Sequence, residues 1–508
     1  MADGTEALQV HSPATGERLG SAPVASPTDV AAALERARRA QAAWGALSVK
    51  ARVPRLARLK ARVVARADEI AALVSAEVGK PLFEAFSMEV MPLLELIATF
   101  EAKGPEVLSE RAIPLRLARH RKSALRYAPR GVVALISPWN FPVAIPGGEL
   151  YLALLAGNAV LLKPSEHAPL SGLLLGELVR EAGLPEGLVE VLCGGPDVGA
   201  ALVESGVDYV AFTGSTASGR QVARACGERL VPFRVELGGK GSAVVLDDAD
   251  LGRTAPALVW GAFTNAGQVC AGVQRVYAAR SVFEPLRRAV VDEARKLRVG
   301  DPSSPDCDVG RVCPPFLAAR VRELLSDALS RGAVLEVGEL PEDGSHRVCP
   351  IVLSRVPPDA RVVVEECFGP VLALVEVADE HEALTRFNAL PFGLMGSVFS
   401  RDKARARRVA ERLRAGTVMV NDVVWSYGMP ETPWVGLKQS GMGVTHGDEG
   451  LREYCELRHV NEERVRLVER EPWWFPYSPL RLAAMKAGMK ALYGEGVRQK
   501  LKRLIPLE

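Results

Sequence analysis

Residues 131–136 read GVVALI, and they are the first of four short apolar runs that decide the fold. The other three are AVLLK at 159–163, YVAFT at 209–213 and FRVEL at 233–237. Each run has the length and composition of a buried strand, and helical patterns fill the intervals between them. Strands that alternate with helices predict a parallel sheet with crossover helices on both faces. Such a sheet binds ligands at the carboxyl ends of its strands.

A second α/β set begins at residues 242–246 and runs to about residue 420, which predicts a second domain. We expect the ligand site in the cleft between the two domains, where such sites are commonly found. Residues 143–162 have the length of a membrane span, with one charge. Because Pro146, Gly147 and Gly148 interrupt them, we expect a buried helix, a turn and a core strand instead.

The composition bounds the class of protein. The 508 residues are 48% hydrophobic and 24% charged, which indicates a globular protein of two or three domains. The net charge of +2 gives no sign of a nucleic acid partner. The eight cysteines and seven histidines show no ligand spacing, so we expect a reducing compartment and no metal site. No basic segment followed by an apolar run opens the chain, and we expect a cytoplasmic protein.

Two stretches carry candidate chemistry: residues 265–270 read NAGQVC and residues 236–240 read ELGGK. The thiolate of Cys270 would be a good nucleophile for a carbonyl carbon. The carboxylate of Glu236 would draw a proton from the water that hydrolyses the resulting thioester. Taken alone, each residue also fits a structural role, Cys270 as a small buried side chain and Glu236 as the end of a strand.

These two stretches and three others resemble the signatures of the aldehyde dehydrogenase superfamily, in the same order. The others are SPWNFP at 137–142, FTGS at 212–215 and EECFGP at 365–370, and the match runs from about residue 8 to residue 460. The resemblance implies an α/β fold with a Rossmann-like cofactor domain, an α/β catalytic domain and a small hairpin and strand that build a homodimer or homotetramer. The implied division is 1–110 and 130–238 for the cofactor domain, 111–129 for the hairpin, 239–445 for the catalytic domain, 446–462 for the oligomerisation strand and 463–508 for a basic C-terminal extension.

The resemblance also assigns roles. Cys270 would be the nucleophile, the side-chain amide of Asn140 and the backbone N–H of Cys270 would stabilise the oxyanion, and Glu236 would activate water. The loop from Gly214 to Gly219 follows a strand and opens a helix; by spacing alone it is equally a plain turn, whereas in the family it is the dinucleotide loop. The residues expected at the cofactor are Trp139, Lys163, Ser165, Glu166, Gly214, Ser215, Gly219, Leu237, Glu366 and Phe368.

Glu166 bears on the choice of cofactor. A carboxylate accepts hydrogen bonds from a free ribose diol and repels a 2'-phosphate, which favours NAD over NADP. Lys163 could still serve a phosphate, so NADP stays open. The acyl-transferring relatives that use coenzyme A generally lack the base at Glu236, which argues against that activity. A catalytically silent scaffold would be expected to lack Cys270 or Asn140.

The substrate is predicted from the residues that would line a tunnel. Val143, Ala144, Gly147 and Gly148 are small or apolar and predict a roomy apolar tunnel, and no arginine stands next to Cys270. We expect an apolar aldehyde of medium or long chain, or an aromatic one, and the alternative is succinic or another small semialdehyde. The expected tunnel residues are Phe141, Ile145, Val269, Ala271 and Tyr427, with Trp425 and Trp434 either at the outer mouth or in the core.

The tail departs from the common pattern. Residues 472–477 read PWWFPY, a helical stretch follows at 480–493, and Arg498, Lys500, Lys502 and Arg503 come after it. A basic amphipathic helix with aromatic anchors can lie on an anionic membrane surface. This predicts a peripheral membrane contact through residues 472–503, and the alternative is that the tail packs on its own subunit or on a neighbour.

Overall fold

The structure is a computed structural model that describes residues 6–314, 316–342 and 344–494. This part of the chain forms two compact units. The larger unit holds the residues up to Ser109 together with Tyr127–Leu457, and the smaller holds Glu110–Arg126 and the described residues from Arg458 onward. Among the described residues, no helix is both long and apolar enough to span a lipid bilayer.

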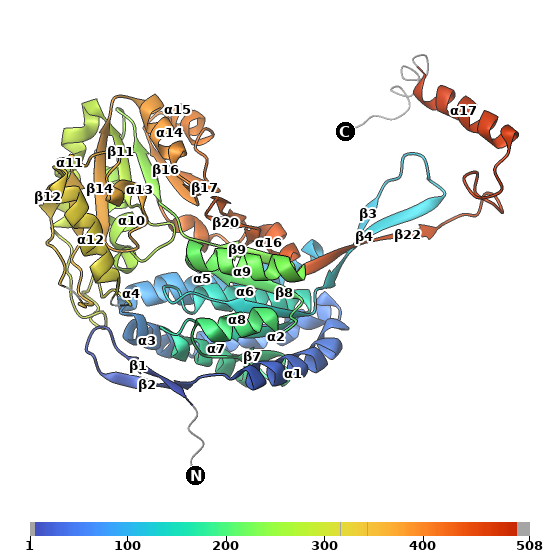
Figure 1. The fold of residues 1–508 in the computed structure, drawn as a ribbon, viewed down its shortest axis with the longest axis horizontal. Coiled ribbons are helices and arrows are strands. Elements are labelled where there is room, and N and C mark those ends of the chain that lie inside the picture. The colour runs from blue at the N-terminus through green and yellow to red at the C-terminus, as the bar shows by residue number, and fades with distance from the viewer. Residues whose placement is uncertain (1–5, 315, 343, 495–508) are drawn as a thin grey trace, which may run out of the picture. The chain divides into compact units, whose positions relative to one another are not determined.

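The first sheet of the larger unit contains the four apolar runs (Figure 1). Every side chain of its three central strands is buried, as expected for parallel strands covered on both faces. Its strands pair in parallel except the first, which is antiparallel to its neighbour. In spatial order they are β20 (Gly441–Met442), β9 (Phe233–Glu236), β8 (Tyr209–Thr213), β5 (Val132–Ile136), β6 (Ala159–Lys163) and β7 (Val189–Val191).

The strand order reverses between β5 and β8. The chain leaves β5 outward through β6 and β7, returns to β8 on the other side of β5, and continues to β9. At such a switch point, the loops that follow the two strands diverge and open a crevice for a ligand. The loops after Ile136 and Thr213 therefore flank this crevice.

Helices cover this sheet, and α1 and α6 both pack against β5 and β6. All of α6 is buried, which explains why its sequence is apolar all round. Residues 143–162 thus form a buried helix, a turn and a core strand, as predicted. The elements of this part are β1 (Ala7–His11), β2 (Arg18–Pro23), α1 (Pro27–Gly45), α2 (Val49–Ala65), α3 (Ala67–Val78), α4 (Leu82–Ala85), the π-helix η1 (Phe86–Val90), α5 (Met91–Val107), α6 (Ala144–Ala156), α7 (Pro169–Glu181), α8 (Pro196–Glu204) and α9 (Thr216–Arg229).

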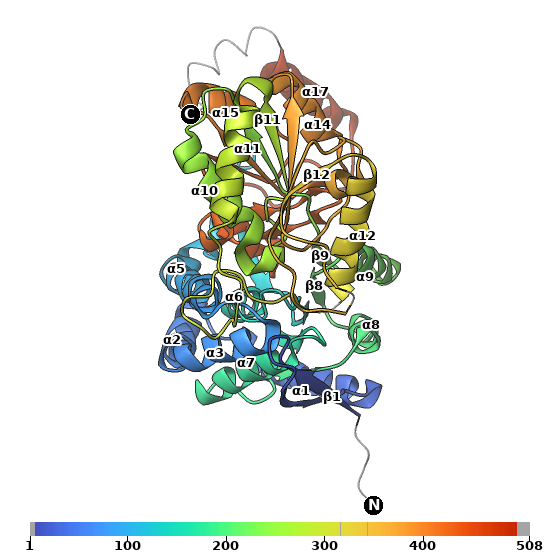
Figure 2. The same ribbon diagram turned by 90° about the vertical axis from the view of Figure 1, so that its left-hand side faces the viewer.

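The second sheet forms a separate lobe of the same unit (Figure 2). Its strands are parallel except β12, and together the two sheets confirm the predicted α/β fold class. In spatial order they are β12 (Val334–Val337), β13 (Ile351–Ser354), β14 (Val371–Val377), β11 (Arg275–Ala279), β10 (Ser242–Val245), β16 (Met395–Phe399) and β17 (Thr417–Val420). The helices of this lobe are α10 (Leu251–Phe263), η2 (Thr264–Gly267), α11 (Arg280–Ala294), α12 (Phe316–Ser330), α13 (Arg361–Val364), α14 (Glu380–Ala389), α15 (Lys403–Ala410) and η3 (Trp425–Gly428).

The segment after β17 differs from the prediction in two places. β20 joins the first sheet through β9, although residues 441–442 fall in the range expected for the catalytic domain. The oligomerisation strand was expected within residues 446–462, but α16 (Gly447–Glu453) occupies the first part of this range and β22 (Cys455–Glu463) follows it. Asp448 and Glu449 lie in the first turn of α16, where acidic side chains stabilise a helix. The short pairs here are β15 (Phe392–Gly393) with β19 (Leu437–Lys438) and β18 (Trp434–Val435) with β21 (Val444–Thr445).

A three-stranded sheet has the order β22, β4 (Arg121–Pro129) and β3 (Arg111–Ile113), and β3 and β4 are antiparallel. The last described element of the tail is α17 (Pro479–Tyr493), none of whose residues is buried. The face of α17 opposite its apolar stripe carries alanine and glycine rather than charged residues, so the helix is less amphipathic than predicted. The predicted basic residues Arg498, Lys500, Lys502 and Arg503 lie outside the described residues.

Candidate active site

Cys270 stands after a tight chain reversal. Asn265, Ala266 and Gly267 all have positive φ, at 49°, 51° and 74°. A Cβ atom on Gly267 would overlap the backbone of Gly369, so only glycine fits there. A left-handed conformation at Ala266 is unfavourable and persists only where the surroundings impose it. The thiol of Cys270 is therefore presented by a rigid loop rather than by a flexible one.

Asn140 is anchored to that loop. Its side-chain amide donates to the carbonyl of Gln268 at 2.9 Å, and its own backbone carbonyl accepts from the amide of Asn265 at 3.0 Å. The same carbonyl accepts from Lys80 Nζ at 2.9 Å. Lys80 is fully buried, pairs with Glu89 and lies 4.0 Å from the centre of the Phe141 ring. These contacts fix Asn140 and the start of the helix that follows it.

Glu236 ends β9 and points at the thiol. Its Oε1 lies 3.8 Å from Cys270 Sγ and accepts a 2.7 Å hydrogen bond from the indole N–H of Trp434. Burial raises the pKa of Glu236 to about 7. Burial and then the negative charge of Glu236 raise the pKa of Cys270 well above its usual value. The thiol is thus protonated at rest, and Glu236 is a carboxylate near neutrality within reach of its proton.

One cavity of about 210 Å³ contains all three predicted catalytic side chains, Cys270, Glu236 and Asn140. Residues from both lobes of the larger unit line it, among them Gly214 from the first lobe and Phe368 from the second. The tertiary structure therefore brings together segments that are separated by more than 100 residues in the chain. The predicted cofactor residues at the same cavity are Trp139, Gly214, Ser215, Leu237, Glu366 and Phe368.

A larger groove of about 510 Å³ continues from this cavity over the crevice between β5 and β8. Ser215 caps α9 by accepting from the N–H of Ser218 at 3.1 Å, so the positive end of this helix faces the groove. Gly219 does not line the groove; a Cβ there would overlap Leu237, and its role is close packing of α9. The predicted residues that line the groove are Trp139, Lys163, Ser165, Glu166, Gly214 and Ser215.

These donors fit a dinucleotide. The helix terminus suits a pyrophosphate, and the carboxylate of Glu166 can accept from a ribose diol. Lys163 Nζ lies 3.6 Å from Glu166 Oε2, and burial lowers the pKa of Lys163. Thr213 lies at the junction of the groove and the cavity.

The adjacent residues Glu365 and Glu366 lie in different environments. Glu365 forms ion pairs with Arg320 and Arg361 at 2.6 and 2.8 Å, which hold its pKa at about 2. Glu366 instead faces the cavity, accepts from the N–H of Gly239 at 2.9 Å, and has its pKa raised to about 7 by burial. Only Glu366 is therefore placed to meet a bound molecule.

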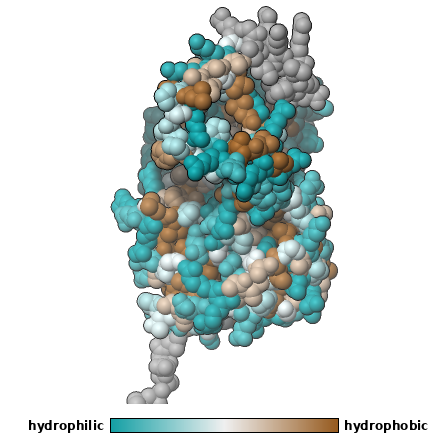
Figure 3. Space-filling view, turned by 90° about the vertical axis from the view of Figure 1, so that its right-hand side faces the viewer, coloured by the Kyte–Doolittle hydropathy of each residue, from teal (hydrophilic) through white to brown (hydrophobic). Residues whose placement is uncertain are grey.

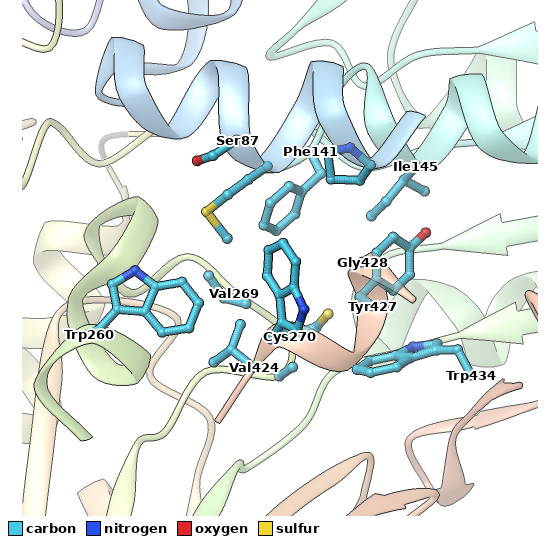
Figure 4. Close-up of a pocket in the computed structure, with 14 residues that line it drawn as sticks. Ser87, Phe141, Ile145, Trp260, Val269, Cys270, Val424, Tyr427, Gly428 and Trp434 are labelled. Atoms are coloured by element: carbon cyan, nitrogen blue, oxygen red, sulfur yellow. The ribbon is translucent and has the colours of Figure 1, made fainter. Parts of the chain in front are cut away.

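A second, narrow cavity of about 50 Å³ also reaches Cys270 (Figure 4). In Figure 4, Phe141 and Ile145 lie above Cys270 and Trp260 lies to its left. Among the residues that the structure describes, none that lines this cavity is charged. All five predicted tunnel residues line it, namely Phe141, Ile145, Val269, Ala271 and Tyr427, and they are joined by Ser87, Met88, Pro92, Trp260, Val424, Trp425, Gly428 and Trp434.

The prediction of a roomy tunnel from Gly147 and Gly148 is wrong. A Cβ on Gly147 would press against Leu93, and one on Gly148 against Leu96. These glycines let α6 approach α5 closely and do not face the tunnel. The tunnel instead opens into an outer groove of about 650 Å³, because both are lined by Ser87, Met88, Trp260 and Trp425.

Sequence reasoning missed several supports of this site. Trp434 was expected at a tunnel mouth or in the core, and no local pattern indicates its hydrogen bond to a residue 198 positions away. Ser87 and Met88 come from η1, where the wide π-helical turn is not visible as a period in the sequence. Within the described part of the chain, no group of three or more potential metal ligands is found.

Comparison with known proteins places these features in context. A family model for the aldehyde dehydrogenase family matches residues 1–460. A 4,4'-diapolycopene aldehyde oxidase of Methylomonas sp is 37% identical over 491 residues, which cover 95% of this chain and 91% of the relative. A protein of Mycobacterium tuberculosis, named as an NADP(+)-type succinate-semialdehyde dehydrogenase, is 34% identical over 455 residues. The match covers 89% of this chain and 88% of that protein.

Solved structures agree with the fold. The NAD+ complex of an aldehyde dehydrogenase from Bacillus cereus is similar with a TM-score of 0.86 at 30% identity. The similarity covers 90% of this chain and 93% of that one.

Proposed function

The chain belongs to the aldehyde dehydrogenase family, and from this premise we propose that it oxidises an apolar, medium-chain to long-chain or aromatic aldehyde to its carboxylic acid, with NAD as the preferred acceptor. The observation that carries the substrate class is the narrow cavity at Cys270, which lacks charged side chains among the described residues. An aldehyde with a carboxylate at its far end would have to lose the hydration of that charge without a cationic partner.

The proposed reaction begins at Cys270. Its sulfur forms a bond to the aldehyde carbon while the thiol proton passes to Glu236, whose Oε1 lies 3.8 Å from the sulfur. The carbonyl oxygen becomes an oxyanion, which the amide of Asn140 and the backbone N–H of Cys270 stabilise. The carbon then gives up a hydride, for which a bound nicotinamide cofactor supplies the acceptor. A thioester on Cys270 remains.

Hydrolysis completes the cycle. After Glu236 has released its first proton to solvent, it accepts a second from a water molecule that attacks the thioester carbon. The C–S bond breaks, and the products are the carboxylic acid and the Cys270 thiolate. A base with a pKa of about 7 suits this task, because it is largely ionised just above neutral pH and still basic enough to accept a proton.

The preference for NAD rests on Glu166. Its carboxylate lies in the groove 3.6 Å from Lys163, so it offsets a cation that would otherwise attract a 2'-phosphate. Among relatives, both choices occur, since one solved structure is an NAD+ complex and one curated relative is named for NADP(+).

The relatives also bear on the substrate. A match that covers 95% of the 508 residues extends at least to about residue 480, so the diapolycopene aldehyde oxidase shares part of the tail. The semialdehyde dehydrogenase is matched over a smaller share of this chain. The outer groove adds room beyond Trp260 and Trp425, and charged side chains, Lys296 and Arg298 among them, line part of it. A small semialdehyde remains the second candidate, favoured by that relative's 34% identity.

We expect decanal to be oxidised with at least about tenfold higher kcat/KM than succinic semialdehyde, since burying a carboxylate without a partner costs well over 1.4 kcal/mol. The measurement is the initial rate of NAD and NADP reduction by the purified chain with decanal, benzaldehyde and succinic semialdehyde. Equal or better use of succinic semialdehyde would show that a cationic anchor reaches the tunnel and would reverse the assignment.

We further propose that the tail lies on an anionic membrane surface, a location that would suit an apolar substrate. We also propose that the three-stranded sheet of the smaller unit mediates a homo-oligomer. Residues 472–494 carry Arg481, Lys486 and Lys490 and no acidic residue. The apolar side chains of this segment are exposed. Figure 3 shows one face of the molecule, on which hydrophobic side chains (brown) lie among hydrophilic ones (teal). They are Trp473, Trp474, Phe475, Tyr477, Leu480, Leu482, Met485, Met489, Leu492 and Tyr493, each between 37% and 81% exposed.

We expect the full chain to sediment with vesicles that contain phosphatidylserine, and less with pure phosphatidylcholine vesicles or at about 1 M salt, because salt screens the basic residues. A chain that ends at Glu471 should stay in the supernatant. The double substitution Lys486→Glu/Lys490→Glu is the matched control for charge. Sedimentation of the shortened chain, or none of the full chain, contradicts the proposal; in the second case the tail packs on protein.

A further inference from the structure

We propose that Trp434 is a positioning residue of the reaction, whose indole N–H holds the carboxylate of Glu236 against the thiol of Cys270. This inference rests on the proposed role of Glu236 as the base. Among the tunnel residues, Trp434 is distinguished by a directed hydrogen bond to a reacting group rather than by apolar contact alone.

The geometry of the carboxylate carries the argument. A single oxygen of Glu236, Oε1, both accepts from the Trp434 indole at 2.7 Å and lies 3.8 Å from Cys270 Sγ. The other oxygen, Oε2, is buried without a hydrogen-bond partner among the described residues. Among the described residues, the Trp434 indole is therefore the only nitrogen donor that forms a hydrogen bond with this carboxylate. Without it, rotation about the side-chain bonds of Glu236 would lose this restraint.

Trp434 is itself held rigidly. It is 2% exposed, its strand β18 pairs with β21, and its ring meets the Tyr427 ring edge-on at 5.3 Å and 85°. Further along this segment, Gly441 of β20 pairs with Glu236 of β9. Donor and acceptor thus belong to segments that are bound to each other through the backbone, so the donor does not move independently of the base.

The charged groups around Glu236 show how this hydrogen bond affects the pKa of the carboxylate. The groups that face Glu236 are Cys270 from the loop after η2, Glu149 from α6, Arg234 from β9 and Tyr427 from η3. Burial and Glu149 raise the pKa of Glu236, whereas Trp434, Arg234 and Cys270 lower it. Arg234 is already paired with Glu149 at 2.7 Å. Trp434 is the foremost of the influences that keep the base ionised near neutral pH.

The test is Trp434→Phe, which keeps an aromatic ring and removes the N–H. An N–H bond to a carboxylate stabilises the ionised form, so its loss raises the pKa of Glu236 and moves the acidic limb of the kcat profile to higher pH. We expect a shift of about one pH unit and about a tenfold loss of kcat below that limb. If Trp434 only lined the tunnel, KM would change and the limb would stay in place.

Trp44→Phe is the matched control, because the buried Trp44 indole donates an equivalent 2.8 Å bond to the carbonyl of Leu154, and neither residue lines the tunnel or the catalytic cavity. It should lower stability and leave the limb unmoved. A second readout needs no aldehyde: the pH dependence of Cys270 alkylation by iodoacetamide should shift in Trp434→Phe, since Glu236 accepts from that thiol.

Superimposable profiles for Trp434→Phe and the unsubstituted chain in both experiments would overturn the inference, as would an equal shift in Trp44→Phe. The variant Glu236→Gln separates this failure from that of the proposed function. If Glu236→Gln keeps full activity, the proposed base is wrong; if it is inactive while Trp434→Phe has an unmoved limb, only the role of Trp434 fails.

Discussion

Replacement of Cys270 by alanine is expected to reduce aldehyde-dependent NADH formation by at least about a thousandfold, the largest effect that any single substitution should have. The substitution removes the atom that would form the covalent bond, and no other group in the cavity can replace a sulfur nucleophile. Cofactor binding should persist, because Cys270 lines the cavity near Glu366 and not the larger groove. The measurements are the initial rate of NADH formation and the quenching of protein fluorescence by added NAD.

Cys226→Ala serves as the matched control for this experiment. Cys226 is buried, lies in α9 and lines neither the tunnel nor the catalytic cavity. It should retain activity within about twofold. Substantial activity in Cys270→Ala would mean that oxidation proceeds without a covalent adduct at this position, and the proposed mechanism would have to be abandoned.

Glu236→Gln should lower kcat by about 10² to 10⁴, the usual contribution of a general base. Glutamine keeps the shape and can still accept from Trp434, but it cannot accept a proton. The small ionised fraction of Cys270 still attacks the aldehyde, whereas the water has lost its base, so the thioester should accumulate. Mass spectrometry of the intact protein after mixing with decanal and NAD should then show the added acyl group.

The pH dependence follows from the raised pKa of Glu236. Burial raises it to about 7, so the basic carboxylate is present above pH 7 and is lost as the pH falls through that value. The kcat of the unsubstituted chain should therefore decline below about pH 7, and this limb should be absent in Glu236→Gln. Glu77→Gln is the control, because Glu77 is also buried with a pKa raised to about 7 but accepts from Ser171 in α7. An unchanged limb in Glu236→Gln would assign the titration to another group.

The same pKa affects stability. The pKa of Glu236 in the folded chain lies above the ordinary carboxylate value, so the folded state binds its proton more tightly than the unfolded state does. This contribution favours folding below the ordinary pKa and is lost as the pH rises toward 7. The requirement for an ionised base and the stability of the fold therefore oppose each other at this residue, as is common in active sites.

The sequence by itself determined the strands that build the first sheet and the identity of the chemically active residues. Runs such as GVVALI at 131–136 are apolar throughout because a parallel strand is buried on both faces, so the signal is local. The motifs around Asn140, Glu236 and Cys270 could be singled out for the same reason, since each is a short string. The switch point between β5 and β8 then gives a physical account of why two of these strings follow strands.

The tertiary structure decided what local patterns cannot contain. The 3.8 Å approach of Glu236 to Cys270 depends on the packing of β9 from one lobe against a loop of the other. The bond from Trp434 joins residues 198 positions apart, and Gly147 and Gly148 turned out to serve helix packing rather than tunnel width. A sequence pattern records the environment of neighbouring residues, whereas distances across a cavity follow from the summed packing of distant segments, and only the folded chain specifies those.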